Sequence, residues 1–431
     1  MKAINGKPFF SGIHVKGKKA LSCGCKTEVM PAPAEVYIST AQSLGRPALV
    51  CVEKGQKVKE GELIAKADGA ISSNVFSSVS GEVVDIKELA TADGRNETFI
   101  VIQNDGSGEK AYLPPLTDPS AEEIKTRIYE CGIVGLGGAG FPTAVKVAPK
   151  TPVDTLILNG AECEPYLTCD HRLMVEYTDE IVRGARLIAK ALGVSKILIG
   201  IEKNKPDAIA AFEAYDDIQP VALKKQYPMG SEKHLIYCST GRKVGLGKLP
   251  ADSGVVVQNV GTAFAVCEAV EKGKPLYERV LTVSGGAVTT PKNLWVKLGT
   301  AVKDIVAYCD GEIEPPKKIV SGGPMTGVAL ASYEAYTHKT SSGVLLMTTR
   351  EAAAEEPTPC LNCGKCADVC PMHLMPMNTA FYAEADDFEA AAKYGNTLAC
   401  IECGACEYIC PAKRPLIQAI RKTKAALRNK K

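Results

Sequence analysis

The feature that most constrains this chain is a cysteine pattern that occurs twice in its last quarter. Each copy has the spacing C-x2-C-x2-C-x3-C-P, first in residues 360–371 and again in residues 400–411. In this arrangement three cysteines of one copy and the fourth cysteine of the other copy bind one [4Fe-4S] cluster. One predicted ligand set is therefore Cys360, Cys363, Cys366 and Cys410, and the second is Cys400, Cys403, Cys406 and Cys370.

The spacing has a physical reason. Cysteines at every third position point three thiolates into one small concavity, and the proline after the fourth cysteine stops the helix there. Structural zinc is the alternative, but zinc sites usually pair two C-x2-C units and need only four ligands each. The doubled motif therefore favours two [4Fe-4S] clusters. Eight of the 17 cysteines are then reduced thiolates, which indicates a reducing compartment such as the cytoplasm.

Composition sets the broad class of the protein. A length of 431 residues predicts two to four domains, and an apolar content of 45% suffices for their cores. The net charge of only +2 gives no reason to expect nucleic acid as a partner. The first residues, MKAINGKPFF, do not resemble a signal peptide, and no apolar stretch is long enough for a transmembrane segment. If the protein takes part in a membrane process, we expect it to do so from the membrane surface.

The first quarter of the chain predicts a small β domain, which we assign to residues 1–113. Between residues 36 and 102, short apolar runs alternate with glycine turns. This pattern of apolar runs and glycine turns resembles that of biotinyl and lipoyl carrier domains, which have a barrel-sandwich fold. The modified lysine is missing, because residues 71–74 at the expected hairpin tip are Ile-Ser-Ser-Asn. We therefore predict a structural or docking module. Cys23 and Cys25 are too few for a metal site on their own.

A glycine-rich loop follows a proline-marked linker and a helix that Ser120 and Glu123 open as a capping box. The loop reads GLGGAGFPTAVK from Gly135 to Lys146. Glycines let backbone N–H groups close on a phosphate or lie flat against a planar ring. Because Pro142 can begin the next helix, its free amides and the Lys146 ammonium favour an anion here.

Strand and helix patterns alternate through the next segment, which predicts a three-layer, Rossmann-like α/β domain over residues 114–278. The buried strand TLILN, residues 155–159, is followed by Glu162 and Glu164, at the sheet edge where α/β proteins bind ligands. These carboxylates are candidate partners for ribose hydroxyls or a nicotinamide amide. The alternative is that both are solvated loop charges.

The segments GLGGAGFPTAVK, NGAECEPYLTCDHRLM and GVVVQNVGT, together with the doubled cysteine motif, resemble the C subunit of the Rnf electron-transport complex over nearly the whole chain. The central segment is also similar to the flavin- and NADH-binding subunit of respiratory complex I. The resemblance implies an FMN site, to which Glu162 also belongs, at Gly135, Gly137, Gly138, Gly140, Lys146, Asn159 and Asn259. It implies nicotinamide contacts from Phe141, Glu164 and Glu232. The chain departs from the complex I relatives at Leu136, Ala161 and residues 230–233.

Two further domains complete the predicted organisation. Residues 279–350 read as a hairpin, a helix and returning strands, which indicates a β-grasp module of the soluble-ligand-binding type. It either binds a separate small ligand or acts as a spacer that orients the cluster domain. Residues 351–431 form the ferredoxin-like domain, with a helix expected between the cysteine motifs over residues 381–395 and a basic helix at the end.

The resemblance implies that electrons pass between NAD(H), FMN and the two clusters. Glu164 would position the nicotinamide, and Lys146 would stabilise negative charge on the flavin or its phosphate. The subunit would then sit peripherally on the cytoplasmic face of the inner membrane, with the membrane subunits and the ferredoxin-accepting iron-sulfur subunit as partners, in a complex that transports sodium ions or protons. Two alternatives remain open: a cobalamin reductase of a bacterial microcompartment, and a non-catalytic iron-sulfur scaffold.

Overall fold

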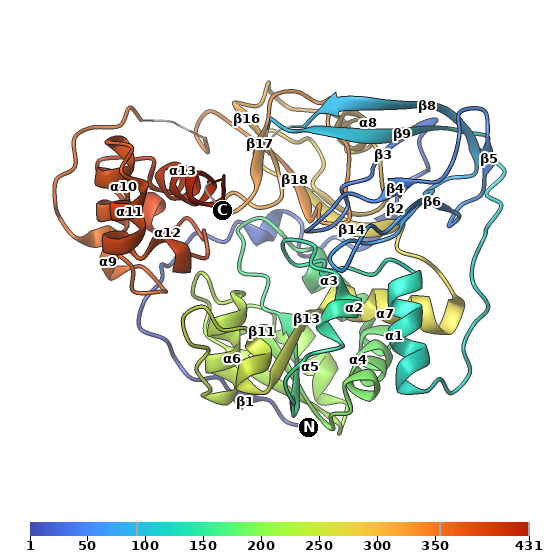
Figure 1. The fold of residues 1–431 in the computed structure, drawn as a ribbon, viewed down its shortest axis with the longest axis horizontal. Helices are drawn as coiled ribbons and strands as arrows, with labels where there is room; N and C mark the ends of the chain where they lie inside the picture. The colour runs from blue at the N-terminus through green and yellow to red at the C-terminus, as the bar shows by residue number, and fades with distance from the viewer. Residues whose placement is uncertain (92–93, 353–354, 430–431) are drawn as a thin grey trace.

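The computed structural model describes residues 1–91, 94–352 and 355–429, and Figure 1 shows how its parts are arranged. The central α/β domain occupies one side, and the barrel and β-grasp modules lie along the other. The cysteine-rich domain lies at one end of the molecule. Parts of the predicted linker at 351–359, and the last residues of the predicted cluster domain, lie outside the described residues.

The central domain is built on a parallel sheet with the strand order β1-β12-β11-β10-β13. Its inner strands are apolar on both faces because helices cover both sides. In β10, for example, Leu156 and Leu158 belong to one hydrophobic core and Ile157 belongs to the other. The predicted three-layer α/β arrangement is confirmed. Its main strands are β10 (Thr155–Gly160), β11 (Lys196–Glu202), β12 (Ile218–Leu223) and β13 (Val255–Asn259).

Helices α1 (Ala121–Glu130), α4 (Thr178–Leu192) and α7 (Val260–Lys272) cover one face of this sheet, and α6 (Glu232–Thr240) covers the other. The predicted capping box at the start of α1 is present, with the Ser120 side chain accepting from the Glu123 amide. Helices α4 and α7 pack closely at Gly184, where a Cβ would lie 1.8 Å from the Ala263 carbonyl oxygen.

The first residues of the chain do not belong to the barrel with which they were grouped in the 1–113 prediction. Strand β1 (Ile4–Asn5) pairs in parallel with β12 of the central sheet. Strand β2 (Thr27–Val29) pairs in parallel with β15 (Lys292–Lys297) of the β-grasp sheet. This N-terminal arm therefore ties two other domains together. Pairings across such sequence distances leave no local pattern, which explains why they were not predicted.

The barrel module has two antiparallel sheets, ordered β3-β9-β8-β5 and β4-β6-β7. Alternate side chains such as Val36 and Ile38 in β3 point into a shared core. The barrel-sandwich prediction is confirmed. The strands are β3 (Glu35–Ser39), β4 (Leu49–Val50), β5 (Lys57–Val58), β6 (Leu63–Lys66), β7 (Val75–Phe76), β8 (Gly81–Ala90) and β9 (Asn96–Asn104).

The β-grasp module has the strand order β17-β16-β18-β14-β15, with helix α8 (Val302–Tyr308) packed on its core. The predicted sequence of hairpin, helix and returning strands is confirmed. Its strands are β14 (Glu278–Ser284), β15 (Lys292–Lys297), β16 (Lys318–Ser321), β17 (Val328–Leu330) and β18 (Gly343–Met347).

The cysteine-rich domain is helical. Residues 381–395 are helical as expected, except that the segment is divided between two helices, α10 (Pro376–Glu384) and α11 (Phe388–Gly395). Asp386 has a φ of 55°, which ends α10, and the Asp387 side chain caps α11 by accepting from the Ala390 amide. The remaining helices are α9 (Lys365–Asp368), α12 (Ala405–Ile409) and α13 (Leu416–Asn429). No helix in the described parts of the chain is long and apolar enough to cross a membrane.

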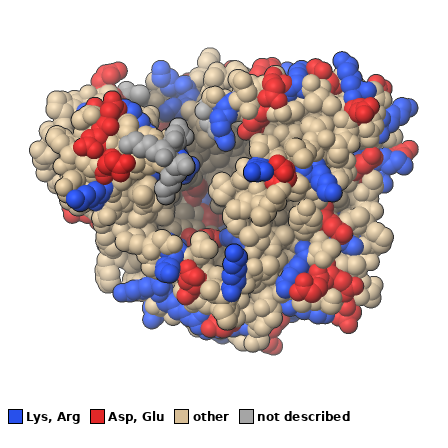
Figure 2. All heavy atoms as spheres, viewed as in Figure 1, with Lys and Arg blue, Asp and Glu red and all other residues tan. Residues whose placement is uncertain are grey.

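Charge is spread over the visible face of the molecule. Figure 2 shows basic and acidic side chains interspersed there, without a large area of one sign. The same face is hollowed near its centre, where the cysteine-rich domain meets the rest of the molecule. This distribution agrees with the net charge of +2.

Candidate functional site

The glycine loop lies between α1 and the short helix α2 (Thr143–Lys146) and is held at both ends. The Gly135 amide donates to the Phe141 carbonyl at 2.9 Å, which closes the loop at its base. The Leu136 amide donates to the Thr262 hydroxyl at 3.0 Å, which fixes the loop to α7. At Gly138, a Cβ would meet no atom of the described residues within 4 Å, so this part of the loop faces open space.

Two asparagines lie beside the loop at the carboxyl ends of neighbouring strands. Asn159 is the penultimate residue of β10 and pairs in register with Asn259, the last residue of β13. A Cβ on Gly137 would come within 2.7 Å of the Asn259 side-chain nitrogen, so a glycine is needed there. The Asn159 amide group donates to the Gly230 carbonyl at 2.9 Å. This edge of a parallel sheet is where α/β domains bind ligands.

A charged pair completes the cluster of predicted residues. Lys146 at the end of α2 forms an ion pair with Glu232, the first residue of α6, and also donates to the Val257 carbonyl at 3.1 Å. These two side chains are partly exposed, so both remain accessible to a ligand. The structure thus brings together the glycine loop, both asparagines, Lys146 and Glu232. An open glycine backbone, amide groups and one ammonium are a donor set that fits a flavin with its phosphate.

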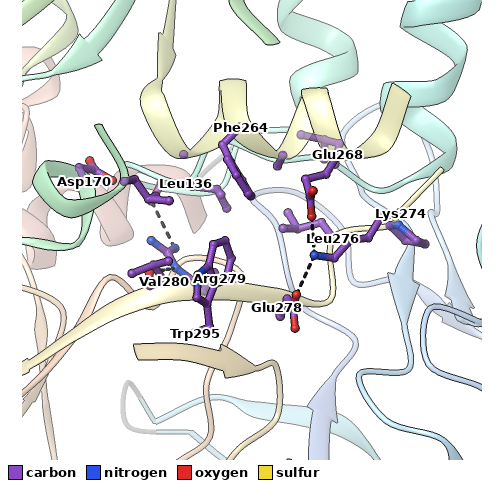
Figure 3. A pocket seen from close by; sticks show the side chains of 15 residues that line it. Leu136, Asp170, Phe264, Glu268, Lys274, Leu276, Glu278, Arg279, Val280 and Trp295 are labelled. Carbon is purple, nitrogen blue, oxygen red and sulfur yellow. Dashed lines mark hydrogen bonds and ion pairs between the residues drawn. The ribbon is translucent and has the colours of Figure 1, made fainter. Parts of the chain in front are cut away.

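Behind the glycine loop lie two buried charged side chains, Asp170 and Arg279, whose role the sequence did not predict. Figure 3 shows Asp170, Leu136 and Arg279 beside a narrow cavity between α7 and β14. Arg279 donates to the Leu136 carbonyl at 3.3 Å and also to the Lys339 carbonyl. The cavity measures about 30 Å³, room for little more than one water molecule, so it supports the loop and does not hold the flavin.

Asp170 links this support to the site. Its carboxylate accepts from the Asn259 side chain at 2.7 Å. Burial, reinforced by the nearby Glu162 carboxylate, raises the pKa of Asp170 to about 6. Asp170 lies in the segment TCDHRLM, which carries the family resemblance, but nothing in its spacing singles out this side chain.

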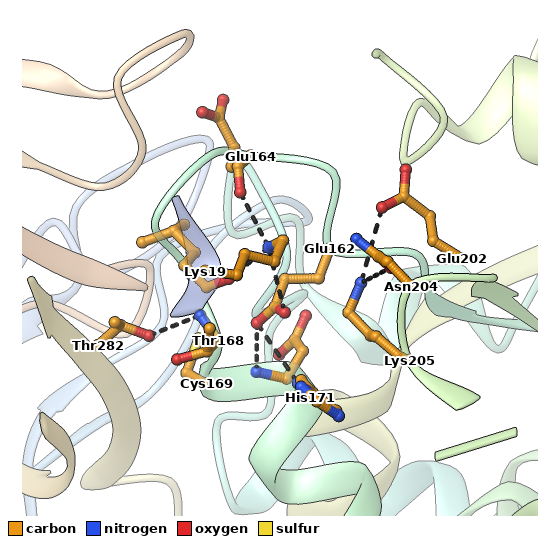
Figure 4. A network of polar contacts seen from close by, with 12 residues as sticks. Lys19, Glu162, Glu164, Thr168, Cys169, His171, Glu202, Asn204, Lys205 and Thr282 are labelled. Atoms are coloured by element: carbon orange, nitrogen blue, oxygen red, sulfur yellow. Dashed lines mark hydrogen bonds and ion pairs between the residues drawn. The ribbon is translucent and has the colours of Figure 1, made fainter. Parts of the chain in front are cut away.

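The two loop glutamates are engaged within the protein, so the alternative that they are solvated was wrong. The Glu162 side chain is only 3% exposed and lies 3.4 Å from the Lys19 ammonium. Its other oxygen accepts from the Asp170 amide at 2.7 Å, at the start of α3 (Cys169–Glu176). Figure 4 shows this network, with Lys19 placed between Glu162 and the Glu164 backbone.

The Glu164 carboxylate is held by the β-grasp module. Its carboxylate accepts from the Met325 amide at 3.1 Å and from the Thr326 hydroxyl. Both partners lie in the turn between β16 and β17, so Glu164 joins the central domain to the β-grasp module. Burial raises the pKa of its carboxyl above the ordinary value, although these two hydrogen bonds partly oppose the shift. The contact favours the spacer role of the β-grasp module over an independent ligand site.

The cysteines gather into two groups that match the predicted sets. We call Cys360, Cys363, Cys366 and Cys410 the first nest, and they line one cavity of about 500 Å³. We call Cys370, Cys400, Cys403 and Cys406 the second nest, and they line another cavity.

Backbone amides point at thiol sulfurs in the second nest, from Leu374 to Cys370 and from Glu402 to Cys400, both at 3.3 Å. Four cysteines around one hollow, with amide donors to sulfur, fit a [4Fe-4S] cluster.

Comparison with known proteins finds four domain families along the chain. Residues 7–107 match the RnfC barrel sandwich hybrid domain, and residues 128–268 match the Nuo51 FMN-binding domain. Residues 280–329 match the SLBB domain, and residues 353–411 match the 4Fe-4S dicluster domain. A flavin-binding α/β domain joined to a dicluster domain defines a component of the flavin and iron-sulfur oxidoreductase class.

The relatives narrow this class. The C subunit of the proton-translocating ferredoxin:NAD(+) oxidoreductase complex of Clostridium ljungdahlii is 45% identical over 97% of this chain and 94% of its own length. The C subunit of the Na(+)-translocating ferredoxin:NAD(+) oxidoreductase complex of Acetobacterium woodii is 41% identical over 96% of each chain. Among solved structures, a NAD+-reducing [NiFe]-hydrogenase aligns with a TM-score of 0.49 at 21% identity, over 72% of this chain and 61% of its own. The chain belongs to the family of C subunits of Rnf-type ion-translocating oxidoreductase complexes.

Proposed function

We propose that this chain is the NAD(H)-linked subunit of an ion-translocating ferredoxin:NAD oxidoreductase complex, passing electrons between NAD(H), FMN and two [4Fe-4S] clusters. The observation that carries the proposal is the gathering of the glycine loop, Asn159, Asn259 and Lys146 at one sheet edge. The same chain folds its cysteines into two nests. The names of the relatives agree with this combination.

The residues around the loop receive distinct roles. The loop glycines 135, 137, 138 and 140, with Asn159 and Asn259, would cradle FMN, and Lys146 would neutralise its phosphate or reduced ring. Phe141 and Glu232 would contact the nicotinamide. When bound, FMN supplies the conversion between two-electron hydride transfer and single-electron transfer. Glu162 and Glu164 receive a revised role, because their carboxylates hold α3 and the β-grasp turn in place.

The cysteine nests would bind one cluster each, with the ligand sets crossing between the two motifs as predicted. The membrane subunits and the ferredoxin-accepting subunit of the complex would be its partners, at the cytoplasmic face of the membrane. The ion path would lie in those membrane subunits.

The Lys146 ammonium gives a direct test of the flavin site. Replacing it in Lys146→Met removes a charge-assisted contact worth about 1.5–3 kcal/mol, so FMN should bind roughly 10- to 100-fold more weakly. Quenching of flavin fluorescence, as FMN is added to deflavinated protein, measures this affinity. Lys150→Met, which changes an exposed lysine four residues further along the chain, is the matched control and should leave the affinity for FMN unchanged. Equal affinities for both variants would count against a flavin at this loop.

A further inference from the structure

One loop of the central domain touches both the candidate flavin site and the second cysteine nest. It lies between β12 and α6, and for this purpose we take it from Gln226 to His234, which includes the first turn of α6. On the flavin side, the Gly230 carbonyl accepts from Asn159 at 2.9 Å, and Glu232 pairs with Lys146. The loop is therefore anchored to the residues that we assign to FMN.

On its other side, the same loop donates two hydrogen bonds to the cysteine-rich domain. The Tyr227 hydroxyl donates to the Cys403 carbonyl at 2.7 Å. His234 Nε2 lies 3.0 Å from the Pro371 carbonyl, which directly follows Cys370. Because a carbonyl oxygen can only accept, Nε2 carries the proton, and Nδ1 accepts from the Ser231 hydroxyl at 3.2 Å. Both acceptors are peptide groups of the second nest.

The contact between this loop and the second nest is buried and includes a hydrophobic cluster. Cys163 accepts from the Gly230 amide at 3.2 Å and packs with Tyr227, Cys403 and Met325 in one hydrophobic cluster. Tyr227 is 3% exposed and Cys403 is 8% exposed, so water is largely excluded from this contact. Hydrogen bonds to peptides beside a cluster act more strongly in such a dry environment.

The first nest lies in a different environment. Cys360 and Cys363 are exposed, as are the neighbouring side chains of Leu361 and Phe381. None of the hydrogen bonds from the loop at 226–234 reaches this nest within the described residues. The two nests are therefore unequal: the second faces the flavin site and the first faces outward.

We propose that the cluster in the second nest exchanges electrons directly with the flavin, and that Tyr227 and His234 are positioning residues that hold it there and tune its potential. This inference rests on the proposed function. Cys370, Cys400, Cys403 and Cys406 would hold a cluster that accepts one electron at a time from a flavin at the glycine loop, and the first nest would hold the next acceptor. Oxidation of NADH to NAD+ supplies the electrons in pairs.

The test is a redox titration of the purified chain with mediators, followed by electron paramagnetic resonance. Tyr227→Phe removes one hydrogen-bond donor from the second nest and keeps the ring. We expect the midpoint potential of that cluster to shift to a lower value, because the peptide next to its ligand becomes more electron-rich, while the other cluster keeps its potential. The variants Cys363→Ser and Cys400→Ser assign the two signals. Tyr215→Phe, in the same domain but bonded to Asp179, is the control and should shift neither.

Unchanged potentials in Tyr227→Phe, or a shift confined to the first-nest cluster, would overturn the proposal. If Tyr227→Phe does not fold, His234→Gln tests the second hydrogen bond with the same expectation. The titration uses chemical reductant, so it gives its answer even if NADH fails to reduce the protein. A failure of the proposed function would instead appear in the unmodified chain, as absent flavin or absent reduction by NADH.

Discussion

Asp170 shows how a single side chain can serve the flavin site without touching a ligand. Its carboxyl is buried behind the glycine loop and orients Asn259. Since its pKa of about 6 exceeds that of an unfolded aspartate, the native state binds the extra proton at low pH. The stabilisation is complete below the unfolded pKa, and it is lost as the pH rises through the folded pKa.

This sign gives a prediction. Between about pH 4 and pH 6, the free energy of unfolding should fall by up to roughly 1.4 kcal/mol per pH unit because of Asp170. Asp170→Asn keeps an oxygen that can accept from Asn259 but cannot titrate, so this part of the slope should disappear. Anaerobic denaturant titrations at several pH values measure it. Asp179→Asn, which changes an exposed aspartate, serves as the control. Identical slopes in Asp170→Asn and the unmodified chain would show that folding does not raise the pKa of Asp170.

At the level of elements, the tip of the barrel hairpin lacks a carrier lysine and is instead held by a contact with another domain. The tip at residues 71–74 is closed against the rest of the protein by Lys339 of the β-grasp module. The Lys339 ammonium is fully buried and donates to the Ser73 hydroxyl, the Asn74 carbonyl and the Gly132 carbonyl, at 2.6–2.8 Å. One side chain thus joins three domains, and the predicted docking role of the barrel fits this contact.

Removing this lysine should loosen the hairpin tip. Lys339→Met leaves the Asn74 and Gly132 oxygens with only the longer contacts from the Ser73 hydroxyl, which should lower the free energy of unfolding by about 2–4 kcal/mol. Amide hydrogen exchange of the peptide spanning residues 71–76 should become faster. Lys303→Met, which alters an exposed ion pair with Glu334, should change neither quantity. Unchanged exchange at the tip would mean that the barrel is held by other contacts.

Elements that form from local sequence could be predicted, and contacts between domains could not. The strand TLILN and the capping box at Ser120 are local patterns, and both are present. The cysteine spacing likewise determines which thiols gather. By contrast, the pairing of β1 with β12 joins residues more than two hundred positions apart, and the Glu164 contact joins two domains. The sequence offers donors and acceptors for such contacts but does not say which will meet.

At the scale of the whole molecule, the arrangement of the domains suits the electron path that we propose. The glycine loop and paired asparagines lie at one end of the path, and the exposed first nest lies at the other, with the second nest between them. The β-grasp turn at Met325 contacts both Glu164 and the cysteine-rich domain at Gly404. This turn thereby fixes the orientation of the domains that carry the cofactors.

Anaerobic titration of the purified, reconstituted chain with NADH, followed by flavin absorbance and electron paramagnetic resonance, tests the central claim most directly. We predict that NADH bleaches the flavin and that cluster signals then appear. A fully reduced chain should hold about four electrons, two on FMN and one on each cluster. If dithionite reduces both clusters while NADH reduces neither flavin nor cluster, the chain is an iron-sulfur scaffold and the proposed electron path is wrong.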